Sequence, residues 1–180
     1  MKYSDVIKYR KKAIAMLKKA KIALTPEEKN NIEIVDLGLG DFEKIGLAII
    51  TYINNERYCA KELILLPYQI CPEHKHPPIS PSNPGKTETF RCRKGRVVLY
   101  IEGEPSEPEF PLPAKYEKFF TVRKKIILLP GEQYTIPFNT LHWFQAGKEG
   151  AIVSEFSSQS IDEKDIFTDP NIKRIPVIEK

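Results

Sequence analysis

Two of the three histidines in this 180-residue chain, His74 and His76, lie one residue apart in the stretch ICPEHKHPPISPSNPGKTETF. Side chains at positions i and i+2 of a strand point to the same face, so we expect the two imidazoles to converge. A convergent imidazole pair is typical of a metal site. Glu88 would begin the partner strand, with Thr89 on the opposite face, and the third histidine, His142, follows a separate turn. The residue spacing leaves an alternative open, in which the pair lies in a surface loop and His142 is an unrelated core residue.

The elements that must position these residues are one helix and a series of short strands. Residues 4–21 predict an amphipathic helix that Ser4 caps, with its apolar side on a sheet and its lysines in solvent. From residue 32 to 157, short runs rich in Ile, Val, Leu and Tyr alternate with turn residues, and the 15 prolines lie mainly in the connections. We therefore predict one mainly β domain over residues 1–180, with an N-terminal helical segment (1–30), a β core that is a sandwich or small barrel (31–160) and a C-terminal segment (161–180).

Composition excludes several classes of function. The hydrophobic share of 41% and the charged share of 29% are those of a soluble globular protein. The net charge of +4 is mild and no aromatic residues interleave with the basic ones, so we expect no nucleic-acid partner. Apolar runs such as LILLP are too short to cross a bilayer, and the N-terminus lacks the apolar region of a secretory signal, so we expect a cytoplasmic protein with no membrane partner. The three cysteines, Cys59, Cys71 and Cys92, are expected to be reduced and buried, with a metal-ligand role left open for Cys71 and Cys92.

Two stretches have the spacing of known turn-and-ligand motifs. Glu88 is followed after six residues by Gly95, and Gly131 precedes His142 in an arrangement that matches G(X)5PXG(X)2H, with Asn139 in place of the last glycine. This pattern resembles the two motifs of the cupin superfamily. Asn is the non-glycine residue that best tolerates a positive φ, so the replacement is physically mild. There are two departures: 11 residues separate the histidine pair from Glu88, a longer spacing than the motif has, and Ala146 stands where the motif ends in Asn.

The long insertion before Glu88 resembles the D-lyxose isomerase family of cupins. That family has an H-x-H pair, a loop and a K-x-E signature, which Lys86, Thr87 and Glu88 match, and the segment SEFSSQSIDEKDIF is similar to a later family motif. The resemblance covers roughly residues 60 to 170 and implies a cupin-type β-barrel (jelly roll) with an N-terminal helix and a short helical or irregular C-terminal segment. It also implies a divalent metal, Mn²⁺, bound by four residues: His74, His76, Glu88 and His142. The ligand types alone also allow Fe²⁺, Co²⁺, Ni²⁺ or Zn²⁺.

The family resemblance implies proton transfer between C1 and C2 of a sugar, which needs an electrophile, a base and an acid. We expect Lys86 to act on a substrate oxygen, although it could be a solvated loop lysine. Glu155 is the expected acid–base group, because a carboxylate amid apolar strand residues is costly unless it is paired or functional; an outward-facing position is the alternative. Asp162 is expected to be a second acid or to orient the substrate, with Glu163 and Asp165 as competitors.

Other residues have less specific interpretations. Four aromatic residues line a sugar pocket or are plain core: Phe90, Tyr134, Trp143 and Phe144. Arg91, Arg93 and Arg96 would anchor a sugar phosphate, but their alternation favours a solvated strand face.

Our main hypothesis is an isomerase of D-lyxose and D-xylulose, with D-mannose and D-fructose as a second pair. We expect a small-molecule sugar as partner and a homodimer. The alternatives are a cupin phosphosugar isomerase or metal oxygenase, and a sugar-binding cupin without turnover.

Overall fold

The computed structural model describes residues 1–175 and 177–179. Two α-helices, α1 (Tyr3–Lys19) and α2 (Pro26–Asn31), precede the strands. The strands are β1 (Glu33–Val35), β2 (Leu47–Asn54), β3 (Cys59–Leu65), β4 (Ile70–Lys75), β5 (Glu88–Ile101), β6 (Lys124–Leu128), β7 (Gln133–Ile136), β8 (His142–Ser157) and β9 (Ile166–Phe167). Two 3-10 turns, η1 (Glu117–Phe119) and η2 (Asp162–Lys164), lie in the later connections.

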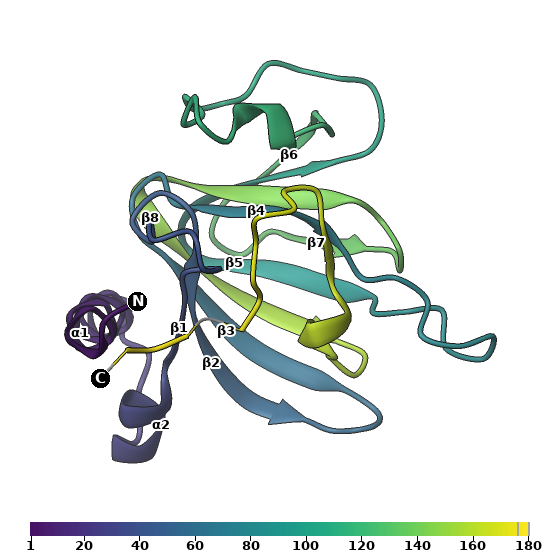
Figure 1. Cartoon of the computed structure of the whole chain (residues 1–180). Helices are drawn as coiled ribbons and strands as arrows, with labels where there is room; N and C mark the ends of the chain where they lie inside the picture. The colour runs from purple at the N-terminus through teal and green to yellow at the C-terminus, as the bar shows by residue number, and fades with distance from the viewer. Residues whose placement is uncertain (176, 180) are drawn as a thin grey trace.

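The strands form one antiparallel sheet that curls into a barrel (Figure 1). Its main path is β1-β2-β3-β8-β4-β9, and β5 pairs with β6, β7 and β8. The pairing register between the long strands β5 and β8 shifts just after the Gly95–Ala151 pair. Gly95 has φ +77°, and a Cβ there would lie 2.0 Å from the Gly150 carbonyl oxygen, so only glycine fits at this position. The curled sheet confirms the predicted mainly β, cupin-type fold.

The inside of the barrel is an apolar core that ends at a polar cavity. Trp143 and Tyr100 are fully buried and stack face to face, with ring centroids 3.8 Å apart. Asn139 has φ +55°, which confirms that it replaces the expected glycine in a left-handed turn before β8. Cys59, Cys71 and Cys92 are free and buried, as expected of reduced thiols.

The N-terminal helix α1 lies against one side of the barrel (Figure 1) and buries Val6, Ala13 and Leu17. The predicted cap at Ser4 is wrong, because the helix begins one residue earlier and the capping position is Lys2, which makes no side-chain cap bond. Helix α2 was not predicted, although Thr25 and Glu28 form a capping box at its start. None of the helices in the described part of the chain has the length and apolarity needed to cross a membrane.

Residues 158–174, which we name the C-terminal strap, cross the mouth of the barrel after β8 (Figure 1). Asn54 at the end of β2 bonds the backbone of Ser160 through both ends of its amide, at 2.9 and 3.1 Å. Strand β9 then pairs with β4, and the Lys173 N–H donates to the Leu37 carbonyl at 2.8 Å. The strap thus contributes side chains to the cavity from a segment that is far from β4 and β5 in sequence.

Candidate metal centre and catalytic site

The three histidines gather at one end of the barrel. His74 on β4 pairs in register with His142, the first residue of β8, and His76 follows directly after β4. One ring nitrogen from each lies within 4.8 Å of the others, and all three side chains are buried. The three histidines therefore form one buried cluster. The alternative, a surface-loop pair with an unrelated core histidine, does not apply.

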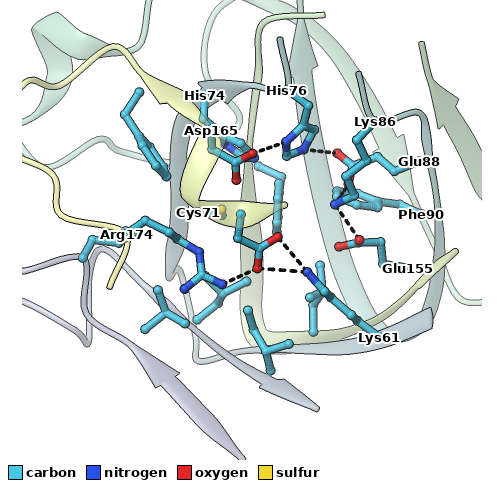
Figure 2. Close-up of a pocket in the computed structure, with 18 residues that line it drawn as sticks. Lys61, Cys71, His74, His76, Lys86, Glu88, Phe90, Glu155, Asp165 and Arg174 are labelled. Carbon is cyan, nitrogen blue, oxygen red and sulfur yellow. Dashed lines mark hydrogen bonds and ion pairs between the residues drawn. The ribbon is translucent and has the colours of Figure 1, made fainter. Parts of the chain in front are cut away.

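Each imidazole is oriented by an acceptor on its Nδ1 atom. His74 Nδ1 donates to the Pro72 carbonyl at 2.8 Å and His142 Nδ1 donates to the Thr140 carbonyl at 2.9 Å. His76 Nδ1 lies 2.5 Å from Oδ1 of Asp165, which belongs to the strap (Figure 2). Because a carbonyl oxygen only accepts, the Nε2 atoms of His74 and His142 carry lone pairs, the form that ligates a metal.

Glu88 Oε1 lies 2.9 Å from His142 Nε2 and 3.3 Å from His76 Nε2. Despite this short distance, the buried His142 Nε2 has no hydrogen-bond partner of suitable geometry within residues 1–175 and 177–179. A lone pair thus faces a buried carboxylate, an arrangement that a bound cation would relieve. The residues present therefore fit a divalent ion with His74, His76, His142 and Glu88 as its ligands.

The electrostatics of the cluster favour added positive charge. Burial, with the nearby rings of His142 and His76, lowers the pKa of His74 well below its ordinary value, which keeps that ring neutral. Burial also acts to lower the pKa of His76, but the carboxylates of Glu88 and Asp165 outweigh it and raise this pKa to about 9. The position between His76 and Glu88 thus attracts a cation, a role that a metal can take instead of a proton.

Lys86 joins the histidine cluster to a second carboxylate. Its Nζ lies 2.6 Å from Glu88 Oε2 and 2.6 Å from Glu155 Oε1 (Figure 2). Burial acts to lower the pKa of Lys86, but Glu155 and Glu88 raise it above its ordinary value, so the side chain is an ammonium at neutral pH. Lys86 and Glu155 are both buried. Lys86 is therefore not a solvated loop lysine, and Glu155 is not an outward-facing strand carboxylate.

A second polar group lies across the cavity, around Asp162. Its carboxylate accepts from Lys61 Nζ at 3.0 and 3.1 Å, and its Oδ2 lies 2.5 Å from Arg174 Nη2 (Figure 2). Burial acts to raise the pKa of Asp162, but Lys61 and Arg174 hold it well below its ordinary value, so this group is a carboxylate and not a proton donor at neutral pH. Sequence reasoning missed Lys61, Arg174 and the contact of Asp165 with His76. Lys61 gave a usable signal, because it is a charged residue amid the apolar strand CAKELIL.

Apart from the fully buried His142, these groups line one cavity of about 50 Å³ (Figure 2). Its apolar wall is formed by eight residues: Val35, Leu37, Leu47, Ile49, Leu63, Phe90, Phe144 and Phe167. Two of the four aromatic candidates, Phe90 and Phe144, thus belong to the lining, whereas Trp143 is core and Tyr134 packs against the core from a partly buried position. Cys71 also lines the cavity, but burial raises the pKa of its thiol well above the ordinary value, which disfavours the thiolate that binds metals.

The three arginines considered as a phosphate anchor do not line this cavity. Arg91 donates to Gln133 at 2.9 Å from an exposed position, and Arg93 lies 3.4 Å from the Ser154 hydroxyl. Arg96 forms an ion pair with Glu109 at 2.6 Å. Arg91 and Arg93 therefore lie on a solvated strand face, as their alternation in the sequence favours. Arg96 belongs to an ion pair near the surface.

Comparison with known proteins identifies several close relatives, although no family model matches the chain. The chain is 66% identical to the D-lyxose ketol-isomerase of Thermofilum sp. over 94% of both chains. It is 62% identical to the D-lyxose/D-mannose isomerase of Thermosediminibacter oceani over 99% of both. The L-ribose isomerases of Acinetobacter sp. DL28 and Cellulomonas parahominis share the fold, with TM-scores of 0.82 and 0.81 over 99% of this chain and 98% of theirs, at 15% and 16% identity.

Proposed function

We infer that this chain, which belongs to the D-lyxose ketol-isomerase family, is a sugar isomerase that interconverts D-lyxose and D-xylulose, with D-mannose and D-fructose as a second pair. The names of the relatives support these substrates. The single observation that carries the proposed chemistry is the position of Lys86, whose ammonium contacts the candidate ligand Glu88 and the candidate base Glu155 at 2.6 Å each. An electrophile, a metal site and a base thereby meet in one buried cavity.

The proposed metal ligands are His74, His76, His142 and Glu88. A divalent ion held there, which we propose to be Mn²⁺, would polarise the carbonyl and hydroxyl oxygens of the sugar. The Glu88 carboxylate suits Mn²⁺, but three imidazoles also suit Fe²⁺, Ni²⁺ or Zn²⁺, so the choice of Mn²⁺ rests on the family resemblance.

Glu155 is the proposed carbon acid–base. The reaction removes the proton on C2, forms an enediol and returns a proton to C1, while a proton passes from the C2 oxygen to the C1 oxygen. The Glu155 carboxylate takes the C2 proton and gives it to C1, and the Lys86 ammonium stabilises the negative charge that develops on the substrate oxygens. The apolar wall around Phe90 and Phe144 excludes water from this transfer.

Asp162 is the proposed orienting group. Lys61 and Arg174 bind its carboxylate, so it is fixed in place and faces the cavity with fixed acceptor and donor atoms beside it. Such a group suits hydrogen bonding to the hydroxyls at the far end of an open-chain sugar, in agreement with a role in binding more than in proton transfer.

The alternatives have less support. A phosphosugar isomerase needs cationic groups free to bind a phosphate. In the described cavity, however, the lysines and the arginine of the lining (Lys61, Lys86 and Arg174) are each bound to carboxylates, as is His76. A metal oxygenase or a sugar-binding cupin would have no use for the Lys86–Glu155 pair.

The test is ketose formation by protein stripped of metal and then reloaded with Mn²⁺. D-lyxose, D-mannose and a phosphorylated pentose are supplied in parallel. We expect D-xylulose from D-lyxose only in the reloaded sample, slower turnover of D-mannose and none of the phosphosugar. Full metal occupancy without ketose from any sugar would refute the isomerase and favour the binding protein or the oxygenase.

We also propose that the protein acts in the cytoplasm as a homodimer. The three free, buried thiols agree with a reducing compartment. The molar mass from light scattering tests the assembly: twice the mass of the 20.7 kDa chain is expected, and the mass of one chain would refute the dimer.

A further inference from the structure

We propose that Glu73 is a positioning residue whose buried carboxylate clasps two distant segments onto β4 and so holds the three histidines and the groups that orient them. The proposal rests on the metal centre of the proposed function for its consequence, but the clasp itself is a feature of this chain's packing. We name the carboxylate and its four donors the Glu73 clasp.

The clasp consists of four short hydrogen bonds. Oε2 of Glu73 accepts from the backbone N–H groups of Thr121 and Val122, at 2.5 and 2.9 Å. Oε1 accepts from the hydroxyls of Thr121 and Thr168, at 2.8 and 2.6 Å. Thr121 and Val122 follow η1, and Thr168 belongs to the C-terminal strap. One side chain on β4 therefore binds two segments, each more than 40 residues from Glu73 in sequence.

The four donors at this position all need acceptors, and a carboxylate provides them because both of its oxygens only accept. Glu73 is only 1% exposed, and within the described residues no lysine, arginine or histidine forms an ion pair with it. A buried carboxylate without a cation is costly unless its lone pairs are filled, as they are here by four neutral donors. A glutamine would present an NH₂ group to two of these donors and leave them unpaired.

The strap side of the clasp reaches two of the histidines. Thr168 directly follows Phe167, which pairs with His74 in the β4–β9 ladder and stacks on its ring at 5.4 Å. Three residues before Thr168, the strap supplies Asp165 to His76. Anchoring Thr168 therefore holds both the neighbour of His74 and the carboxylate that orients His76.

The other side of the clasp reaches the third histidine. The Val122 N–H donates to Glu73, and the Val122 carbonyl accepts from Trp143 Nε1 at 2.8 Å. Trp143 follows His142 on β8 and is fully buried. Glu73 is therefore connected, through one or two hydrogen bonds, to residues adjacent to His142 as well as to His74 and His76.

The test compares Glu73→Gln with Glu62→Gln. Glu62 is a matched control, because it is also a buried glutamate, but it bonds to Ser154 and Tyr52 on β8 and β2 and not to the strap. We expect Glu73→Gln to accelerate amide hydrogen exchange in residues 162–174 of the metal-free protein by about tenfold or more, with β2 and β3 unchanged. We expect the affinity for Co²⁺, measured by competition with a chelator, to fall by about tenfold, with an altered visible spectrum of the bound ion. Glu62→Gln should leave strap exchange and the Co²⁺ spectrum as in the wild type.

Wild-type exchange in the strap of Glu73→Gln would overturn the clasp. Faster exchange with unchanged Co²⁺ affinity and spectrum would overturn its positioning role and leave only a stabilising one. If Glu73→Gln does not fold, Thr168→Val is used in its place, because valine has nearly the shape of threonine but lacks the hydroxyl that donates to Glu73. The same faster exchange of residues 162–174 is expected from this variant. Because exchange is measured without metal, a wild-type protein that binds no Co²⁺ would refute the metal centre separately from the clasp.

Discussion

Nδ1 of His76 lies 2.5 Å from Oδ1 of Asp165, a residue 89 positions later in the chain. The other two histidines use backbone carbonyls of residues two positions earlier, so their orientation is local. His76 differs because its partner is charged and comes from the C-terminal strap. A carboxylate hydrogen-bonded to Nδ1 raises the basicity of Nε2. The position of the strap therefore affects how tightly His76 can bind a metal.

Asp165→Asn should weaken metal binding with little change in the fold. An amide keeps the shape but loses the charge that orients and polarises His76, and a lost outer-shell partner typically costs about 10- to 100-fold in metal affinity. Competition with a chelator for Mn²⁺ measures the change. Glu163→Gln is the control, since Glu163 is an exposed acid two residues away in η2. Equal affinities for the two variants and the wild type would contradict an orienting role for Asp165.

Glu155→Gln should lower kcat by about 100-fold or more, the usual cost of a lost general base. The metal content should stay stoichiometric, because Glu155 contacts Lys86 and Ser157 and not the histidines. Turnover of D-lyxose and metal analysis on the same sample measure both quantities. Glu149→Gln, an exposed glutamate on the same strand, should retain full activity. A Glu155→Gln enzyme with near-normal kcat would remove Glu155 from the mechanism.

The sequence predicted the barrel well, because its signals are local. Runs of β-branched and aromatic residues broken by turns indicated the strands, and Asn139 occupies the left-handed turn that its place in the motif implied. Alternation along a strand predicted that His74 and His76 converge, whereas the addition of Glu88 and His142 to the cluster came from the cupin resemblance. Helix α2 had a local signal as well, in the spacing of Thr25 and Glu28, that was not used.

The strap could not be predicted in the same way, because its contacts are made between residues far apart in sequence. Asp162 and Asp165 lie in one irregular segment, and spacing alone does not separate them. The structure gives them different partners: Asp162 lies between Lys61 and Arg174, and Asp165 lies on His76. A role for Asp162 in the reaction stays a prediction. Its contacts with Lys61 and Arg174 favour orientation of the substrate over proton transfer.

Metal removal should destabilise the protein. Without a cation, His142 Nε2 is buried 2.9 Å from Glu88 Oε1 and has no hydrogen-bond partner in the described part of the chain. A ligand that binds only the folded state stabilises it by about 2.7 kcal/mol at a hundredfold excess over Kd. The Tm of protein with Mn²⁺ should therefore exceed that of chelator-treated protein by several degrees. His142→Ala should lose most of this shift, together with metal content and rate. If His142→Ala still binds one equivalent of metal, the ligand set is wrong.

Asp162→Asn should make stability less dependent on acid pH. The pKa of Asp162 is lowered in the folded state, from about 3.9 for an unperturbed aspartate, so its contribution is complete above the unfolded pKa and is lost as pH falls toward the folded pKa. At neutral pH we expect the variant to lose about 1–3 kcal/mol, the range for buried donors left with a weaker partner, since Lys61 keeps Ser160 and Arg174 keeps Glu33. Urea unfolding of metal-free protein from pH 7 to pH 2 measures the free energies. The difference from the wild type should shrink below about pH 4, whereas Glu163→Gln should follow the wild type throughout. A difference that stays constant over this range would show that Lys61 and Arg174 do not hold Asp162 in its charged form.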